Sequence, residues 1–391
     1  MRGFLARLWG RGAEARDGGI SLWPGLPAVS FSGQAVNALA AENLSAVLAC
    51  VGAVASTTAS LPTIVYRATD GGRIEVPDHP VARLIRRPND AQTGPDFLEW
   101  LLSQALLHGN AVAEIVSDGA GRPVALLPVP WGNVSPVLLS GGRLAVDVVG
   151  YQSPWGGTGL SRRLLPGEFL HLKDRSDDGL IGRSRLSRAR EVVGTAQALQ
   201  EWAGTAVRNQ ATPIGAIKLS GKPGPDVLER LRAQMHASFS GPQNARKTLL
   251  LTDGAEWQSL SVSPEDAEML ASRRFTVEEL CRLFQVPPPI AGDLSHGTFT
   301  NSREAGRWFA QFTLSPWCRK IEAEFARSVF TDPRMSLEID MSALMRGDAE
   351  TRWASHKIAV DAGILDANEV REIEGFNPRP ANTDPAAPVV A

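Results

Sequence analysis

Residues 263–330 read S-P-E-D-A-E-M-L-A-S-R-R-F-T-V-E-E-L-C-R-L-F-Q-V-P-P-P-I-A-G-D-L-S-H-G-T-F-T-N-S-R-E-A-G-R-W-F-A-Q-F-T-L-S-P-W-C-R-K-I-E-A-E-F-A-R-S-V-F. A helix is expected to begin with Ser263 as its N-cap and Pro264 at its first position. It is expected to end at Val286, because the three prolines that follow lack the N–H groups that would continue it. The stretch therefore predicts a long helix over 263–286 that is stopped by prolines.

A second long helix is expected after this stop. Apolar residues recur at helical spacing over 303–330, and Pro316 lies inside the pattern. Because Pro316 cannot donate to the carbonyl of Phe312, we expect a kink there. Between the helices lies a polar loop, with Gly292 and Gly297 as its expected hinge points. The loop residues are Asp293, Leu294, Ser295, His296, Gly297, Thr298, Phe299, Thr300 and Asn301.

Composition limits the classes of function. The chain has 391 residues, 43% of them apolar, which is enough to build two or three packed domains. Its net charge is −2, which argues against tight nucleic-acid binding through clustered basic side chains but permits DNA to slide past. The three cysteines form no C-x-x-C pair and favour buried free thiols in a reducing cytoplasm. No membrane span and no signal peptide are expected.

A search for catalytic motifs finds none. The sequence has one Gly-Lys dipeptide, Gly221-Lys222. It is followed by proline and lacks the first glycine of a phosphate-binding loop. A G-x-S-x-G nucleophile elbow is absent, and the histidines do not show H-E-x-x-H or similar metal spacing. We therefore expect no catalytic residues, no metal site, no cofactor and no enzymatic activity.

The first half of the chain has the pattern of an α+β body. Residues 11–38 are rich in Gly, Ser and Pro, and a flexible arm is predicted over 1–38. Helices are expected over Glu42–Thr58 and from the capped sequence at Thr93 to His108, with a strand over Leu61–Arg67 between them. Short β runs from Ala111 to Lys173 then predict an antiparallel sheet.

A long helix is expected over Leu186–Arg208, followed by a compact αβ insert. Mostly small residues recur on this helix at steps of three and four and would allow a neighbouring helix to approach closely. They are Val192, Ala196, Leu199, Ala203 and Ala206. An ordinary core face explains this seam equally well. The insert has a basic rim, which is either a contact surface or a solvated edge: Lys218, Lys222, Arg246 and Lys247.

The C-terminal part predicts a strand over Met335–Ile339 and two short helices. One helix is expected over Asp348–Asp361, and the next is capped by Asp366 with Glu369 as its capping-box partner. The tail from Asn377 to Ala391 has the composition of a disordered segment.

Several ordered motifs together resemble the portal proteins of long-tailed (siphovirus-type) phages, prophages and gene transfer agents. They are E-N-L-S-A-V-L-A-C-V, L-P-T-I-V-Y, H-P-V-A-R-L-I-R-R-P-N-D, L-L-H-G-N-A, G-E-F-L-H-L-K, G-L-I-G-R-S, L-F-Q-V-P-P-P-I-A-G-D, F-T-L-S-P-W, L-M-R-G-D-A-E-T-R, G-I-L-D-A-N-E-V-R and G-F-N-P. The set spans roughly Ala40–Pro380, nearly the whole chain. No single motif decides the resemblance; their order does.

The resemblance implies a portal fold with named parts. It implies a wing of helices and antiparallel sheet, a two-helix stem, an αβ clip, a tunnel loop with a kinked helix, and a small helical crown. The boundaries are a flexible arm at 1–38, the wing at 39–182, stem helices at 183–211 and 263–286, the clip at 212–262, the proline stop and tunnel loop at 287–302, the kinked helix and return to the wing at 303–345, the crown at 346–376 and the tail at 377–391.

The resemblance also implies a function. A ring of identical subunits, a dodecamer in this family, would sit at a capsid vertex, conduct double-stranded DNA without sequence preference during packaging and ejection, and join head to tail. The partners implied are the terminase large subunit and head–tail adaptor at the clip, and the major capsid protein. The particle would assemble in the host cytoplasm. The residues leave open whether it belongs to a phage, a prophage or a gene transfer agent.

Two other classes of function are compatible with parts of the chain. The segment Thr351–Glu374 resembles a helix–turn–helix, which would make the protein a DNA-binding regulator. Its second helix, however, carries more carboxylates than basic side chains, which phosphates would repel. A packaging-associated enzyme such as a nuclease is the third class, and it lacks visible metal-ligand spacing.

Overall fold

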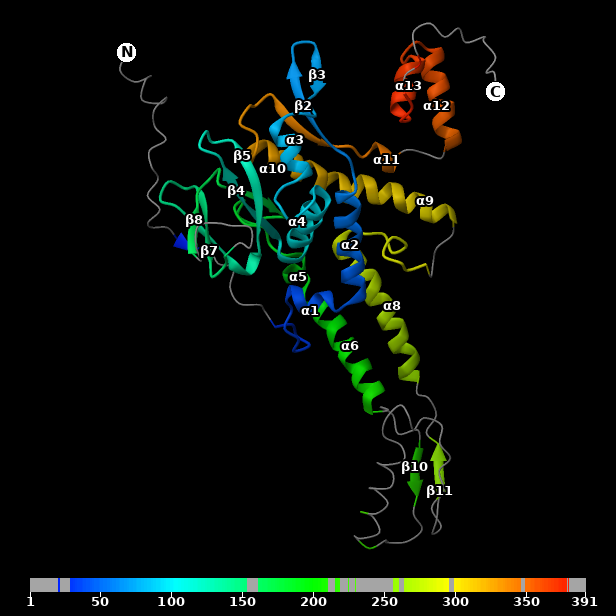
Figure 1. Cartoon of the computed structure of the whole chain (residues 1–391). Coiled ribbons are helices and arrows are strands. Elements are labelled where there is room, and N and C mark those ends of the chain that lie inside the picture. The colour runs from blue at the N-terminus through cyan, green and yellow to red at the C-terminus, as the bar shows by residue number, and fades with distance from the viewer. Residues whose placement is uncertain are drawn as a thin grey trace. The chain divides into compact units, whose positions relative to one another are not determined.

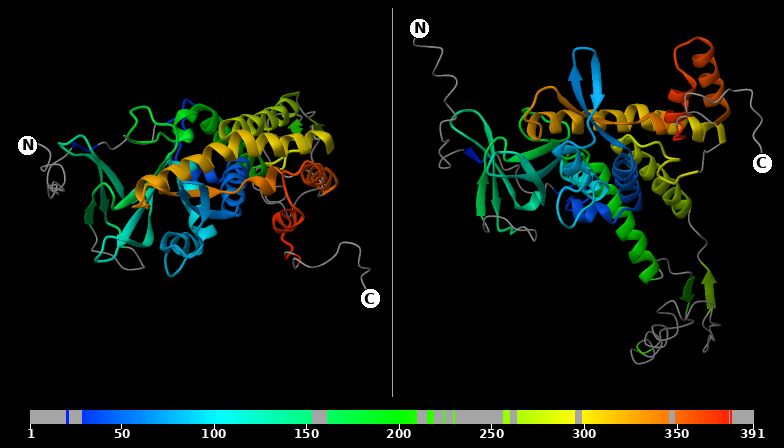
Figure 2. Two further views of the ribbon diagram at one scale, coloured as in Figure 1. Left: turned by 90° about the horizontal axis from the view of Figure 1, so that it is seen from above. Right: turned by 45° about the horizontal axis from the view of Figure 1, so that its top comes forward.

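The computed structural model describes residues 20–21, 29–152, 161–209, 215–218, 224, 229, 256–259, 264–294, 299–345, 349–377 and 379. The chain divides into two compact units, Met1–Ile339 and Asp340–Ala391, which we describe separately. The first unit consists of helices and antiparallel sheets, as expected for an α+β fold (Figures 1 and 2).

Helix α4 (Gly94–His108) packs against α2 (Ser45–Ala59) in the first unit. The side chain of Thr93 caps its N-terminus, so the predicted N-cap is confirmed; the Thr93 N–H also donates to the Asp96 carboxylate at 3.0 Å, which completes a capping box. Gly109, with φ of +80°, ends the helix in a left-handed conformation that glycine adopts without a Cβ clash. Two shorter helices, α1 (Ala38–Glu42) and α3 (Pro80–Arg86), flank this pair in sequence.

The β runs between Ala111 and Lys173 form two antiparallel sheets. The three-stranded sheet has the order β5-β4-β9, and the four-stranded sheet has the order β1-β6-β7-β8. The strands are β1 (Ile20–Ser21), β4 (Asn110–Ser117), β5 (Pro123–Val129), β6 (Val134–Leu138), β7 (Leu144–Val149), β8 (Ser161–Leu164) and β9 (Phe169–Lys173). A 3₁₀ turn, η2 (Trp131–Asn133), connects the two sheets.

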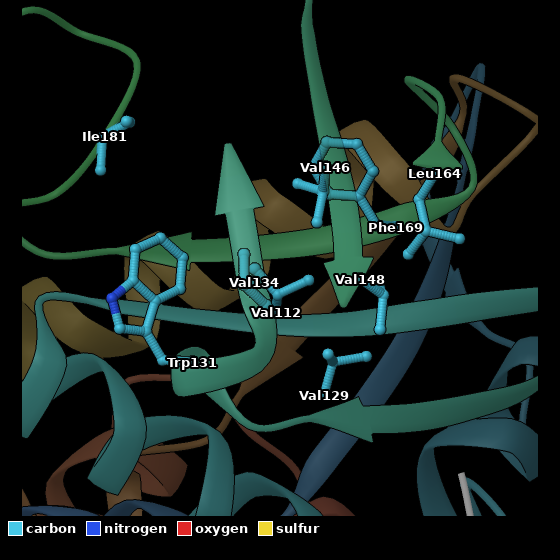
Figure 3. Packing of buried hydrophobic residues seen from close by; sticks show 9 residues of the cluster. All are labelled: Val112, Val129, Trp131, Val134, Val146, Val148, Leu164, Phe169 and Ile181. Carbon is cyan, nitrogen blue, oxygen red and sulfur yellow. The ribbon is translucent and has the colours of Figure 1, made fainter. Parts of the chain in front are cut away.

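A hydrophobic core joins the two sheets (Figure 3). Its buried side chains come from both of them and from the segments beside them: Val112, Val129, Trp131, Val134, Val146, Val148, Leu164, Phe169 and Ile181. Burying each such side chain stabilises the fold by about 1.5–3 kcal/mol. An ion pair links the sheets at the same place, since Arg162 Nε of β8 donates to Glu114 Oε2 of β4 at 3.0 Å and both side chains are almost fully buried.

The N-terminal arm is anchored in two places, which corrects the prediction of a flexible arm over 1–38 for these residues. Ile20 and Ser21 pair with β6 and thereby supply backbone partners to a strand that otherwise ends the sheet. Farther along, the Phe31 N–H donates to the Glu191 carboxylate at 2.8 Å. Ser30 lies against Gly194, where the absence of a side chain leaves room for it.

A third sheet closes the first unit. Strand β12 (Met335–Ile339) pairs antiparallel with β2 (Thr63–Thr69), and β3 (Gly72–Glu75) pairs with the other edge of β2. The strand predicted over Met335–Ile339 is therefore confirmed, and it brings the end of the unit back to its beginning. The Ile339 N–H donates to the carboxylate of Glu322 at 2.9 Å, which ties this sheet to the helix that precedes it.

The helix expected over Leu186–Arg208 is broken near its start into α5 (Arg185–Arg188) and α6 (Arg190–Asn209). Ala189, at φ −109° and ψ 34°, leaves the helical conformation and separates the two. Helix α6 contacts α8 (Pro264–Phe284), which follows it across the insert (Figure 1). In the insert, β10 (Gly215–Lys218) pairs antiparallel with β11 (Glu256–Ser259). Between these two strands the structure describes only residues 224 and 229.

The second long helix is continuous but changes its hydrogen-bonding pattern. It consists of α9 (Phe299–Trp308), a π-helical segment η4 (Phe309–Leu314) and α10 (Ser315–Ser328). The Ser315 N–H donates to the carbonyl of Ala310, five residues earlier. A kink was predicted at Pro316; the structure has a π-helical segment directly before this proline.

The second unit contains α11 (Ser342–Met345), α12 (Ala349–Asp361) and α13 (Ala367–Ile373). Asp366 and Glu369 form the predicted capping box. Glu374 holds the two longer helices together, since its carboxylate accepts from Arg352 at 2.6 Å and contacts His356 at 2.9 Å.

Candidate channel loop and its anchor

The loop predicted to face DNA follows α8, whose C-terminal end is fixed by its own backbone. Gln285 has φ of +61°, and the Val286 N–H donates to the carbonyl of Cys281 at 2.9 Å. This bond closes a Schellman-type helix end. Cys281, Phe284 and Val286 are buried, so the point at which the chain leaves the helix cannot move without disturbing packed side chains.

The three prolines form a compact turn directly after this helix end. The Ile290 N–H donates to the carbonyl of Pro287, and the Asp293 N–H donates to that of Pro288, both at 2.9 Å. Gly292 has φ of +91°, a conformation that side chains disfavour. The predicted proline stop is therefore confirmed. The hydrogen bonds of the turn also fix the backbone at Asp293, where the loop begins.

The loop itself is shorter than predicted. Three of the predicted loop residues lie in α9 instead: Phe299, Thr300 and Asn301. Their helix propensity is modest, but no proline or glycine lies between Gly297 and Gly306 to stop a helix there. Asp293 and Leu294 remain in the loop. Leu294 is 66% exposed, so it does not anchor the loop in the core. Residues 295–298, with Ser295, His296, Gly297 and Thr298, lie outside the described residues.

The helix that leaves the loop is tied back to the helix that enters it. The hydroxyl of Thr313, which is buried in η4, donates to the carbonyl of Gln285 at the end of α8. The π turn also leaves Trp308 and Phe312 on the outside, with ring centroids 5.4 Å apart. They are 44% and 51% exposed. Two neighbouring exposed aromatic side chains on the surface of one subunit are typical of a protein contact surface.

A groove of about 740 Å³ lies between the end of α8, the proline turn and α9. Its lining is mainly apolar, with charged side chains at the rim. The lining residues are Glu278, Cys281, Arg282, Gln285, Val286, Pro287, Pro288, Pro289, Asp293, Glu304, Ala305 and Trp308.

An ionic cluster around Asp174 links α5, α8 and α10, and the sequence analysis did not identify it. Asp174, which is 6% exposed, accepts from Arg185 Nε at 2.6 Å and lies 3.8 Å from Lys320 Nζ. Arg185 also donates to the carbonyl of Leu283 in the last turn of α8 at 3.3 Å. Both cations lie over the ring of Trp317 in α10. One buried carboxylate thus connects α5, α8 and α10 where the loop is anchored.

Two glycines and an asparagine form a neighbouring contact between the start of β4 and the segment that precedes α5. Gly182 N–H donates to Asn110 Oδ1 at 2.8 Å, and Asn110 Nδ2 donates to the Gly182 carbonyl at 2.7 Å. A Cβ on Gly182 would lie 2.0 Å from the carbonyl oxygen of Gly109. The buried ring of His171 lies 2.9 Å from Asn110 Oδ1, and burial lowers its pKa to about 3, so it stays neutral. These contacts give a physical reason for the motifs L-L-H-G-N-A and G-L-I-G-R-S.

The small-residue seam of α6 lies partly inside the subunit. Ala196 is buried, and with Leu199 it lines a small cavity of about 70 Å³ against α8 and the start of α2. Val192 and Ala203 are partly buried, and the side chain of Ala206 lies outside the described residues. Packing within the chain therefore already uses the Ala196 end of the seam, while Ala203 stays partly accessible for a neighbour.

The predicted basic rim of the insert is described at one position. Lys218 lies in β10, opposite Glu256 of β11 in the register, and Lys222, Arg246 and Lys247 lie outside the described residues. Within the described part of the chain, no three His, Cys, Asp or Glu side chains are grouped so as to hold a metal ion. None of the described helices is long and apolar enough to cross a membrane.

Comparison with known proteins identifies the family. The family described as phage portal protein matches residues 45–375. The chain belongs to the phage portal protein family. The probable portal protein of Streptomyces phage phiC31 is 30% identical over 97% of this chain and 86% of its own length. The portal protein of Enterobacteria phage HK97 is 30% identical over 86% of this chain and 80% of its own length.

Solved structures agree with this portal assignment. The neck of an empty gene transfer agent particle, computed with C6 symmetry, contains a chain that is 25% identical, with a TM-score of 0.63 over 93% of this chain and 98% of that one. A chain in the neck of the native particle, computed with C12 symmetry, is 23% identical with a TM-score of 0.59 over the same shares. The portal fold predicted from the sequence is confirmed.

Proposed function

We propose that this chain forms the portal ring at one vertex of a phage-like capsid, joins head to tail, and conducts double-stranded DNA through its centre. The observation that carries the proposal is the portal family match, which spans residues 45–375. The likeness to a chain in the neck of a gene transfer agent particle supports it. The particle type, whether phage, prophage or gene transfer agent, does not alter this role.

The loop after α8 supports a conduit in particular. Its base is rigid, because the Schellman-type end and the proline turn hold the chain at Asp293. Residues 293–301 contain one aspartate, one histidine and no Lys or Arg. Hydroxyl and amide groups make exchangeable contacts with phosphates, whereas a ring of lysines would bind a polyanion that carries one charge per about 1.7 Å. A polar loop on a firm base suits passage of DNA.

The parts of the chain are assigned accordingly. The wing comprises residues 39–182, and the stem comprises 183–211 and 263–286. The clip at 212–262 meets the terminase large subunit during packaging and the head–tail adaptor afterwards, and the wing meets the major capsid protein. The crown comprises 346–376. Twelve subunits form the ring, as the C12 symmetry of the related native neck suggests.

The protein acts as a structural component and leaves ATP hydrolysis to the separate motor. No observation favours the regulator, because the carboxylate of Glu374 in its helix–turn–helix-like segment is already paired with Arg352 and His356.

Light scattering of the purified full chain tests the proposal. At 41.9 kDa per subunit, a twelve-subunit ring gives a species of roughly half a megadalton. DNA binding by this species should be weak, steeply salt-dependent and independent of sequence. A monomer or dimer that binds one DNA sequence at nanomolar concentration in physiological salt would overturn the portal proposal in favour of the regulator.

A further inference from the structure

Two cysteines from distant parts of the chain lie side by side in the core. Cys50 is on α2 and Cys281 is on α8, 231 residues apart in sequence, and their sulfur atoms are 3.9 Å apart. Neither side chain has any exposed surface. The third cysteine, Cys318, lies on α10 and is also a buried free thiol. The chain thus contains one close pair and one cysteine outside it.

We propose that Cys50 and Cys281 form an oxidisable dithiol that closes to a disulfide once the protein leaves a reducing compartment, and that this bond fastens α2 to the base of the channel loop. The inference goes beyond the portal role and depends only on the fold of the first unit.

The two sulfur atoms, 3.9 Å apart, lie within reach of a disulfide bond. A disulfide needs sulfur atoms about 2 Å apart, so the pair has to close by about 2 Å. Rotation about the Cα–Cβ bond of either cysteine moves its sulfur by an amount of this order. The helices that carry the pair, α2 and α8, already contact each other, so closure does not require separate elements to meet.

One member of the pair lies beside a surface groove, so a local opening of the groove wall is enough to expose its sulfur to an oxidant. Cys281 lines the groove of about 740 Å³ at the end of α8, which is large enough for a small disulfide molecule. Cys50 is not among the residues that line it. Cys281 is therefore the attacking thiol, and Cys50 is the resolving thiol behind it.

The Cys281 thiol is more acidic than the Cys50 thiol, as expected if Cys281 attacks first. The Cys50 thiol donates its hydrogen bond to the sulfur of Cys281. This hydrogen bond lowers the pKa of Cys281 and raises that of Cys50. A thiolate is the reactive form in thiol–disulfide exchange.

The reaction is an exchange with a low-molecular-weight disulfide. The Cys281 thiolate attacks one sulfur of that disulfide, forms a mixed disulfide and releases one small thiol after protonation. Cys50 then loses its proton and attacks the Cys281 sulfur, which forms the protein disulfide and expels the second small thiol. Two protein thiols are oxidised and one small disulfide is reduced to two thiols, so atoms and electrons balance.

The disulfide would fix the end of α8, from which the channel loop starts, to α2. Cys281 accepts the hydrogen bond of Val286 that ends α8, so a covalent bond from Cys281 to α2 holds the loop anchor in place. A crosslink over a long stretch of chain restricts the unfolded state strongly. In a reducing cytoplasm the pair stays open during assembly, and in the oxidising exterior it closes.

The test uses the full-length protein, purified under reducing conditions, freed of reductant and incubated while folded with cystamine. The proposal expects the titratable thiols, counted after denaturation, to fall from three to one, with a crosslink between the peptides that contain Cys50 and Cys281. The melting temperature should rise and return on reduction. Cys318→Ser should behave as wild type, whereas Cys50→Ser should stop at a mixed disulfide on Cys281.

Three results would overturn the proposal. They are retention of all three thiols in the folded protein, a crosslink that includes Cys318, and oxidation that occurs only in denaturant. Peptide mapping of the wild-type protein decides among these without any variant, so a misfolded Cys50→Ser protein does not remove the test.

Discussion

Gly182→Ala should destabilise the first unit severely, because the added methyl group has no space. Its Cβ would lie 2.0 Å from the Gly109 carbonyl oxygen and 3.0 Å from the Asp174 nitrogen. Both are backbone atoms, which cannot rotate away as a side chain can. The two hydrogen bonds between Asn110 and Gly182, at 2.8 and 2.7 Å, would be strained at the same time.

The magnitude follows from these two effects. Overpacking in a well-packed site costs about 1–3 kcal/mol, and backbone against backbone belongs at the upper end of this range. Weakening two buried hydrogen bonds adds about 1 kcal/mol each. The expected loss in the free energy of unfolding is therefore about 3–5 kcal/mol, a large part of the 5–15 kcal/mol typical of a domain.

Urea unfolding followed by tryptophan fluorescence measures this loss, at matched protein concentration because assembly adds to apparent stability. Gly52→Ala is the control. Gly52 lies within α2, and a Cβ there would meet nothing within 4 Å, so alanine should stabilise the protein by about 0.5–1 kcal/mol. A Gly182→Ala protein within about 1 kcal/mol of wild type would refute the proposed close packing at this junction.

Three further predictions concern the loop, the seam and pH. Replacing residues 293–298 with a short Gly/Ser linker should leave rings intact but shorten the DNA protected in particles, as electron microscopy and nuclease digestion can show; loss of rings would mean that the loop holds subunits together. Ala196→Arg should prevent folding because it buries a charge inside the subunit. Ala203→Arg should fold but fail to form rings in size-exclusion chromatography, whereas Gln200→Arg should both fold and form rings. Identical profiles for all three variants would reject the seam. Because buried His171 stays neutral when folded and binds a proton when unfolded, stability should fall by about 2 kcal/mol more in wild type than in His171→Gln between pH 7 and pH 5; equal losses in urea titrations would show that His171 is protonated in the fold.

Local signals in the sequence predicted the helix ends well. Thr93 and Asp96 form their capping box, Gly109 ends the helix that they begin, and the three prolines stop α8. Each of these features depends on a few neighbouring residues, for which the conformational preferences are strong. The confirmed portal fold, in contrast, came from the order of motifs along the chain and not from any one of them.

Contacts between distant residues were not predictable in the same way. The pairing of β12 with β2 joins residues more than 260 positions apart, and no periodicity specifies such a partner. Asn110 and Gly182 appeared as separate motifs until the fold placed them in contact. The exposure of Trp308 and Phe312 does not follow from the apolar spacing either, because Phe309 in the same stretch is buried while these two are exposed.

Electron cryo-microscopy of the purified full chain tests the central claim most directly. We predict a closed ring with an axial channel, in which Asp293 and Leu294 of every subunit face the channel and α6 of one subunit lies beside the stem of the next. Failure to form a ring, or a ring in which these two residues face outward, would contradict the account.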